Sequence, residues 1–266
     1  MECRGSAARV AADRKRLRLG DSHLESSPAQ EAGFEYVGDE LGVFKYATNW
    51  KRYWGSKIRS YLGSNVLEVG AGIGGTTAVL GTSEFDSWTG IEPDAAMIND
   101  LKRRQEAGEF GSNISFREAT VQDLAGQELF DSIIYIDVLE HIEHDKQELE
   151  DASRHLHPGG HLIVLSPAFA FLYTPFDKAI GHFRRYTRHA LAELTPPQTQ
   201  VVRLFYLDSI GMLASISNLL LLRASMPTRR QILLWDRAII PVSRWIDPLV
   251  GYQFGRSVIG IWKRNE

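Results

Sequence analysis

The feature that most constrains the fold is a short apolar strand that runs directly into a glycine-rich loop, in the stretch "NVLEVGAGIGGTT". The strand covers residues 65–69, and glycines follow at positions 70, 72, 74 and 75. Glycine reaches backbone conformations that other residues rarely adopt, so the loop can turn tightly and a ligand can approach its main chain. A helix is expected from Gly74. This strand–loop–helix unit predicts an α/β fold with a ligand at the end of its first strand.

Strands and helices alternate along the rest of the chain. Six further apolar or β-branched runs predict strands, and "FDSIIYID" is apolar enough to be buried on both faces. These strands are expected at residues 87–92, 113–120, 130–137, 161–167, 199–207 and 256–264. Helices are expected at residues 44–62, after a cap at Asp94, and at residues 145–156. The alternation predicts one mostly parallel sheet.

Length and composition favour one large domain. A chain of 266 residues suffices for an α/β domain with an insertion, and its net charge of −3 gives no reason to expect nucleic acid. The single cysteine, Cys3, excludes a disulfide framework within the chain. The first residues lack an apolar signal core, so we expect a cytoplasmic protein with a flexible arm at residues 1–30 and one domain at residues 31–266.

Chemically suggestive residues follow four of the expected strands. They are the Glu68–Gly74 loop, Glu92, Thr120 and Asp137. The carboxyl ends of parallel strands meet at one edge of a sheet, where such folds bind ligands. The sequence therefore predicts a single site at this edge.

The glycine loop fits two cofactors, and charge separates them. Glycines at 70, 72 and 75 match a dinucleotide fingerprint, which brings an anionic pyrophosphate to the loop. S-adenosylmethionine brings an ammonium and a sulfonium instead. A Glu68 carboxylate about 4 Å from such a cation is worth on the order of 4 kcal/mol before desolvation. Glu68 therefore favours S-adenosylmethionine, whereas Glu92 could accept ribose hydroxyls from either cofactor.

Four motifs in this order resemble those of the class I S-adenosylmethionine-dependent methyltransferases. They are "VLEVGAGIGG", "GIEPD", "FDSIIYIDVLEHI" and "LHPGGHLIVLSP", and the resemblance covers residues 40–206. It implies a Rossmann-like seven-stranded sheet whose last strand is antiparallel. The segments "GHFRRYTRHAL" and "YQFGRSVIGIWKR" further resemble a bacterial branch that methylates small molecules.

The resemblance also implies roles for individual residues. Glu92 would bind the ribose hydroxyls, Pro93 would lie beside the adenine, and Asp137 would lie near the methionine ammonium. The remaining implied cofactor contacts are Glu68, Gly70, Ala71, Gly72, Gly74, Thr120, Val121 and Val138. Many members carry an aspartate where this chain has Ala119, Thr120 and Val121, so the contact to the adenine amino group is left open between Thr120 and a backbone carbonyl.

Two histidines are candidates for a catalytic base. His141 follows the fourth strand and His182 follows the fifth, and a hydroxyl or carbon-acid acceptor would need a base of this kind. Arg184, Arg185 and Tyr186 are candidate substrate contacts, although consecutive arginines should not face the same way. A metal held by Asp137, Glu140 and Asp145 is the less favoured route, and we expect no metal.

Residues 208–252 form an apolar insertion with helical periodicity between the last two strands. The run at 204–222 contains Asp208 and Gly211, which makes it a poor membrane span. We expect a lid over the carboxyl edge of the sheet, formed with the aromatic helix at 44–62. A substrate with a hydrophobic part would fit beneath it. Core packing, a homodimer contact and peripheral membrane contact are the alternatives.

The sequence thus predicts methyl transfer from S-adenosylmethionine to an oxygen, nitrogen or carbon atom of a small acceptor. Two alternatives stay open: a nicotinamide oxidoreductase, and a partner protein that binds the cofactor without turnover.

Overall fold

The computed structural model of the chain describes residue 42 and residues 44–221 and 228–266. All of them belong to one compact unit, Gly33–Glu266. The expected N-terminal arm at residues 1–30 lies outside the described residues. None of the described helices is both long enough and apolar enough to cross a bilayer.

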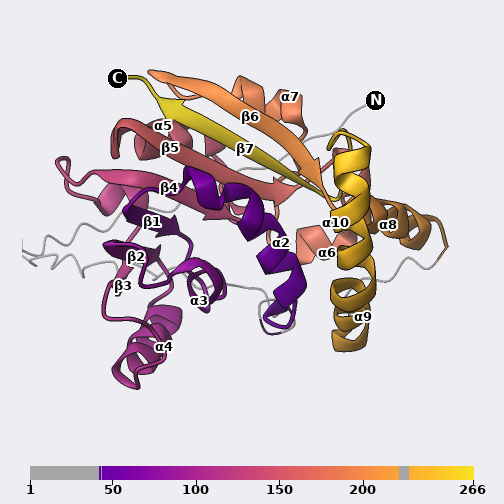
Figure 1. The fold of residues 1–266 in the computed structure, drawn as a ribbon, viewed down its shortest axis with the longest axis horizontal. Helices are drawn as coiled ribbons and strands as arrows, with labels where there is room; N and C mark the ends of the chain where they lie inside the picture. Colours follow the sequence, from indigo (N-terminus) through magenta and orange to yellow (C-terminus); the bar gives the residue numbers. More distant parts are fainter. Residues whose placement is uncertain (1–41, 43, 222–227) are drawn as a thin grey trace, which may run out of the picture. The chain divides into compact units, whose positions relative to one another are not determined.

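A seven-stranded sheet in the order β3-β2-β1-β4-β5-β7-β6 forms the centre of this unit (Figure 1). β1 pairs in parallel with β2 and β4, whereas β7 runs antiparallel to both of its neighbours, β5 and β6. The strands are β1 (Asn65–Val69), β2 (Ser87–Glu92), β3 (Ile114–Glu118), β4 (Phe130–Ile136), β5 (Leu156–Pro167), β6 (Thr199–Leu207) and β7 (Ser257–Arg264). The predicted Rossmann-like sheet and its antiparallel last strand are therefore confirmed.

Helices cover both faces of the sheet, because its central strands are apolar on both sides. In β4, Ile134 belongs to one core cluster, while Ile133 and Tyr135 belong to the cluster on the other face. The main helices are α2 (Thr48–Ile58), α3 (Thr77–Leu80), α4 (Ala95–Glu106), α5 (Asp145–Arg154), α6 (Pro175–Ala179) and α7 (Arg188–Glu193).

The predicted boundaries hold closely at the first strands. β1 begins and ends where expected, and the Asp94 side chain caps α4 by accepting from the amides of Ala96 and Met97. The main difference is at β5, which begins at Leu156 rather than at residue 161. The "HPGG" turn there is an irregularity within the strand, between the pairs Phe130–Leu156 and Ser132–His161.

The segment between β6 and β7 is helical, as its periodicity predicts. It contains α8 (Ser209–Leu221), α9 (Arg229–Leu234), a π-helical turn (Trp235–Ile239) and α10 (Ile240–Leu249). α9 and α10 follow each other in one column beside α2 (Figure 1). Its role as a lid stays a prediction.

Buried aspartates fix this segment to the sheet and to α2. Asp247 accepts hydrogen bonds from the Tyr53 hydroxyl and from the amides of Asp208 and Ser209. Asp208 accepts from the Trp235 indole at 2.8 Å. Buried polar groups are costly unless they are paired, so these bonds hold Trp235 in one place.

We predict that Asp247→Ala lowers the free energy of unfolding by at least about 3 kcal/mol, because it leaves three buried donors without an acceptor. Tyr53→Phe removes only one of these donors, so its effect is expected to be about 1 kcal/mol. Urea denaturation measures both. The exposed Asp86 provides the control, since Asp86→Ala should stay within about 0.5 kcal/mol of the parent chain. A loss below about 1 kcal/mol in Asp247→Ala would contradict this anchoring role.

Candidate active site

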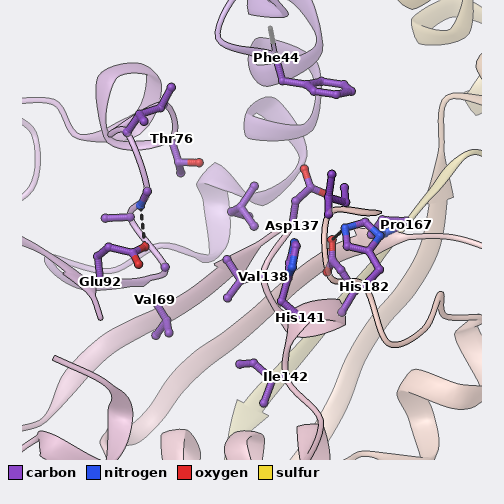
Figure 2. Close-up of a pocket in the computed structure, with 18 of the residues that line it drawn as sticks. Phe44, Val69, Thr76, Glu92, Asp137, Val138, His141, Ile142, Pro167 and His182 are labelled. Atoms are coloured by element: carbon purple, nitrogen blue, oxygen red, sulfur yellow. Dashed lines mark hydrogen bonds and ion pairs between the residues drawn. The ribbon is translucent and has the colours of Figure 1, made fainter. Parts of the chain in front are cut away.

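A cavity of about 530 Å³ lies at the carboxyl ends of β1, β2, β4 and β5 (Figure 2). Figure 2 shows Glu92 on one side of it and Asp137, His141 and His182 on the other. A volume of this size is in the range that binds drug-sized ligands. The structure therefore brings the predicted strand-end residues to one site.

The glycine loop is held against the end of β2. The amides of Gly70 and Ala71 donate to the Ile91 carbonyl at 2.9 and 3.0 Å. Gly70 has φ +70°, and a Cβ built on it would lie 2.6 Å from Val138 Cγ2. Glycine is required there both for the conformation and for the close approach of Val138.

Glu92 bridges the loop and the start of α4. One carboxyl oxygen accepts from the Gly72 amide at 3.0 Å, and the other accepts from the Asp94 amide at 3.1 Å. Burial raises the pKa of Glu92, and these two amides oppose that rise. The Gly72 amide thus points at a carboxylate, which leaves it poorly placed to bind a pyrophosphate.

Glu68 lies beneath the loop and does not line the cavity. It accepts from the Thr77 hydroxyl at 2.5 Å and from the Trp88 indole at 2.8 Å. Burial raises its pKa to about 7, although these hydrogen bonds and Lys51 oppose the rise. The expected direct contact of Glu68 with a cofactor cation is therefore not supported. Gly74 also lies outside the cavity lining.

The remaining implied cofactor residues line the cavity. These are Gly70, Ala71, Gly72, Glu92, Pro93, Thr120, Val121, Asp137 and Val138. The Thr120 hydroxyl donates to Asp123 at 2.7 Å and accepts from the Asp123 amide in a capping box. The identity of the adenine contact stays a prediction.

Asp137 follows β4 in a left-handed conformation, with φ +55°, and its amide donates to the Leu165 carbonyl at 2.8 Å. The side chain is accessible through the cavity but has protein around it. Removal from bulk water raises its pKa to about 6, against the charges of His182 and Arg256. Such strained backbone persists where the surroundings fix it, often at functional sites.

Glu140, His141 and His182 meet at one end of the cavity. The rings of His141 and His182 are edge-to-face with centroids 4.5 Å apart, and His182 Nε2 lies 3.8 Å from Glu140 Oε1. Ligand atoms from all three lie within 4.8 Å of one another, a spacing that could hold a metal ion. This set differs from the carboxylate set considered from the sequence.

Burial determines the charge of two members of this cluster. It lowers the pKa of His141 to about 4, with a further contribution from His182, so His141 is neutral at pH 7. Burial and the neighbouring Asp137 carboxylate raise the pKa of Glu140 well above its ordinary value. A histidine with so low a pKa is a weak base at neutral pH.

Asp177 orients His182. Its Oδ1 lies 3.0 Å from His182 Nδ1, and Arg185 donates to both of its oxygens at 2.8 and 3.0 Å. Burial alone would raise the pKa of Asp177, but the bonds from His182 and Arg185 outweigh it and leave the pKa well below its ordinary value. An ionised Asp177 accepts the Nδ1 proton, so the neutral form of His182 carries its proton on Nδ1.

The backbone around His182 is also fixed. Its amide donates to the Asp177 carbonyl at 2.9 Å, and its own carbonyl accepts from the Tyr173 hydroxyl at 2.6 Å. The next amide, that of Phe183, donates to the Glu140 carbonyl at 2.8 Å. The loop after β5 therefore presents His182 in one orientation.

Arg184 and Tyr186 face away from the cavity, contrary to the substrate contacts expected of them. Arg184 pairs with Asp145 at 2.8 Å, and the Tyr186 hydroxyl donates to the same carboxylate at 2.7 Å. Both residues join the loop after β5 to the start of α5. Arg185 does line the cavity, but Asp177 already occupies its guanidinium. Consecutive side chains point to different sides, so only one arginine could face the site.

Several further residues line the cavity that the sequence did not lead us to expect. Lys51 and Arg256 add positive charge, and Asp177 is the partner of His182. The apolar lining includes Phe44, Trp50, Trp54 and Trp235, which belong to the two segments expected at this edge from the sequence, and also Phe176 and Ile180. Asp177 stands five residues before His182, so a search for a carboxylate near the candidate base could have found it.

Residues 67–162 match a family model described as a methyltransferase domain. A ubiquinone biosynthesis O-methyltransferase of Rickettsia conorii is 30% identical over 99 residues, which cover 37% of this chain and 33% of that protein. Its counterpart in Rickettsia canadensis is also 30% identical over 99 residues, which cover 41% of that protein. The matched region thus covers 33% and 41% of the lengths of these two curated relatives.

Solved structures share the fold. Coclaurine N-methyltransferase, bound to N-methylheliamine and S-adenosylhomocysteine, gives a TM-score of 0.57 at 13% identity, over 82% of this chain and 72% of that one. The N-methyltransferase NodS from Bradyrhizobium japonicum gives 0.51 at 17% identity, over 81% of this chain and 85% of that one. At such identities the likeness establishes the architecture.

We predict that the His141 ring stays neutral in the folded chain at every pH above about 5, because burial lowers its pKa to about 4. Nitrogen-detected NMR titration of the eight histidines measures this, and His141→Gln assigns its signal. In the urea-unfolded chain the same residue should titrate near its ordinary pKa of about 6.5. A folded-state midpoint near 6.5 would show that the ring is solvated.

Proposed function

We propose that this chain, which belongs to the class I S-adenosylmethionine-dependent methyltransferases, transfers a methyl group to a hydroxyl oxygen of a small acceptor with an apolar part. The observation that carries the proposal is the Asp177–His182 pair: Asp177 binds Nδ1, and the ring of His182 lines the cavity together with the strand-end residues. A hydroxyl needs a base to become a strong nucleophile, and this pair supplies one.

The residues of the cavity fit S-adenosylmethionine. Gly70 lets the main chain approach a ligand closely, Glu92 offers carboxyl oxygens to ribose hydroxyls, and Asp137 offers a negative charge to the methionine ammonium. When bound, the cofactor would supply a sulfonium-bound methyl group whose carbon–sulfur bond breaks as the acceptor attacks, with the electron pair staying on the sulfur of the departing neutral thioether. Pro93, Val121 and Val138 give the lining an apolar part for the adenine.

His182 would take the acceptor's hydroxyl proton onto Nε2, while Asp177 holds the Nδ1 proton and stabilises the imidazolium that forms. The hydroxyl oxygen then carries the electron pair that forms the new bond to carbon. Placing acceptor and donor together in one cavity supplies the larger part of the rate enhancement, because the reaction between two bound groups no longer needs an encounter in solution. His141, neutral and adjacent, is the poorer candidate for the base.

The apolar lining supports an acceptor with a hydrophobic part. Phe44 and Trp50 from the α2 side and Trp235 from the helical segment converge on the cavity, and the Trp50 and Trp235 rings are 5.7 Å apart. Burying apolar surface of the acceptor against these rings would contribute about 25 cal/mol to the free energy of binding for each Å² removed from water. The printed names of the Rickettsia relatives, O-methyltransferases of ubiquinone biosynthesis, agree with an acceptor of this kind.

The two alternative functions predict different behaviour. A nicotinamide oxidoreductase would need the loop amides for its pyrophosphate, and here Glu92 occupies the Gly72 amide. That contact argues against a dinucleotide more directly than the position of Glu68 does. A partner protein without turnover would bind the cofactor as this proposal expects but would transfer no methyl group.

We predict that Glu92→Ala weakens S-adenosylmethionine binding by about 1.5–3 kcal/mol, the cost of losing a charged acceptor. Gly72→Val should abolish binding, because its φ of +53° and the cavity both disfavour a branched side chain. Isothermal titration calorimetry measures both, and NAD should give no binding heat. Glu118 on β3 lies opposite Glu92 of β2 in the strand register, but its side chain is exposed, so Glu118→Ala serves as the matched control. Unchanged affinity in a folded Gly72→Val chain would overturn the cofactor assignment.

We predict that His182→Ala lowers kcat by about 10²–10⁴-fold and leaves cofactor affinity nearly unchanged. Asp177→Asn should also lower kcat and shift the pH profile, because it changes the proton at Nδ1. The exposed His144, near in sequence to His141, provides the control His144→Ala.

Treatment with EDTA separates this base from a metal at Glu140, His141 and His182. A Brønsted base predicts unchanged kcat after EDTA. Loss of activity that a divalent ion restores would mean that His182 is a ligand, and the base assignment would be wrong.

A further inference from the structure

We infer that the outer face of α9 and α10 docks onto a bilayer surface that carries anionic lipid. This docking face consists of Leu234, Ala238, Val242, Trp245 and Leu249, together with the arginines at 230, 237 and 244. The docking itself is independent of the proposed chemistry.

The apolar members of the docking face lie on one side of the helical column. Leu234 is 64% exposed, Trp245 80% and Leu249 81%. Steps of three or four residues place them on one side, while Ile232, Trp235, Ile240, Ser243 and Asp247 are buried on the other. A tryptophan and two leucines this exposed are unusual on a water-facing helix, and contiguous exposed apolar side chains mark an interaction surface.

The three arginines of the docking face stand seven residues apart along α9, the π-helical turn and α10. Arg230, Arg237 and Arg244 are all exposed, and so is Arg229. The two acidic residues of 228–250, Asp236 and Asp247, are buried and already bonded to α2. The exposed charge of this stretch is therefore four positive charges and no negative one.

An anionic bilayer complements this arrangement. Apolar and aromatic side chains enter the boundary between headgroups and acyl chains, while arginines bind lipid phosphates, as in amphipathic helices that lie in the interface. Each basic residue near such a surface contributes roughly fivefold to binding. The described helices are too short or too polar to cross the bilayer, so the contact would be peripheral.

Other occupants fit the charge less well. A symmetric second copy would bring these exposed arginines close to the same arginines of its partner, because an isologous interface pairs a patch with the same patch. Residues 1–20 carry six basic and two acidic side chains, so they too would be repelled. Neither supplies the negative charge that the face lacks.

The same column lines the cavity through Trp235, which lies on its buried side. A docked chain would hold the cavity close to the membrane, where an acceptor with a long apolar tail is dissolved. This consequence rests on the proposed function, whereas the docking does not.

The test uses the full chain with vesicles of phosphatidylcholine, alone or with phosphatidylglycerol. Sedimentation should carry the chain down with the anionic vesicles and much less with the neutral ones. Of the six tryptophans, all described, Trp245 alone is exposed, so binding should shift the fluorescence to the blue. Raised salt should weaken binding.

Two sets of variants test the two parts of the face. Arg230→Gln, Arg237→Gln and Arg244→Gln together should weaken vesicle binding about 100-fold. Trp245→Ser with Leu249→Ser should weaken it at least about tenfold and remove the fluorescence shift. Matched controls are Arg103→Gln with Arg154→Gln, and Val201→Ser with Val202→Ser, which change exposed arginines and exposed valines elsewhere. Circular dichroism verifies folding.

Three results would overturn the inference. The chain could stay in the supernatant with anionic vesicles, or the apolar variants could bind vesicles like the parent. The chain could also form a dimer that dissociates in Trp245→Ser. The last would assign the face to self-association. Glu92→Ala should bind vesicles like the parent even where it no longer binds S-adenosylmethionine, so failure of the proposed function and failure of docking are distinguishable.

Discussion

The hydrogen-bonded carboxylate of Asp177 is the interaction on which the candidate chemistry depends. It lies fully buried and accepts from His182, from both ends of the Arg185 guanidinium, and from Thr174. A buried carboxylate with so many donors stays ionised. It therefore fixes both the orientation and the tautomer of His182, and it also turns Arg185 from a candidate substrate contact into a structural partner.

Around this anchor, charges of both signs are packed into one cavity. Asp137 lies among His182, Arg256 and Lys51, while burial and the Asp137 carboxylate raise the pKa of the adjacent Glu140. A cationic cofactor and the removal of a proton both change the charge of such a site. In our proposal Asp137 offers its negative charge to the cofactor cation and His182 accepts the proton. These two residues belong to the loops after β4 and β5, which the parallel sheet brings together.

The sequence predicted the sheet well, because glycine spacing, apolar strands and the Asp94 cap are local signals. It also predicted that Glu92, Asp137, His141 and His182 share one edge. Glu68 and Tyr186 do not line the cavity, because the direction of each side chain depends on its hydrogen bond to Trp88 or Asp145, which lie far away in the chain. Lys51, Trp235 and Arg256 reach the cavity only through tertiary packing, so no local pattern could place them.

The most direct measurement of the central claim is the fate of a labelled methyl group. The purified chain would be incubated with S-adenosylmethionine labelled with ¹³C at the methyl carbon and with an extract of host metabolites, and the organic-soluble products would be examined by carbon NMR. We expect a new signal in the methoxy region, and we expect it to be lost in His182→Ala. Absence of any transferred label, or label found only on nitrogen or carbon, would contradict this expectation.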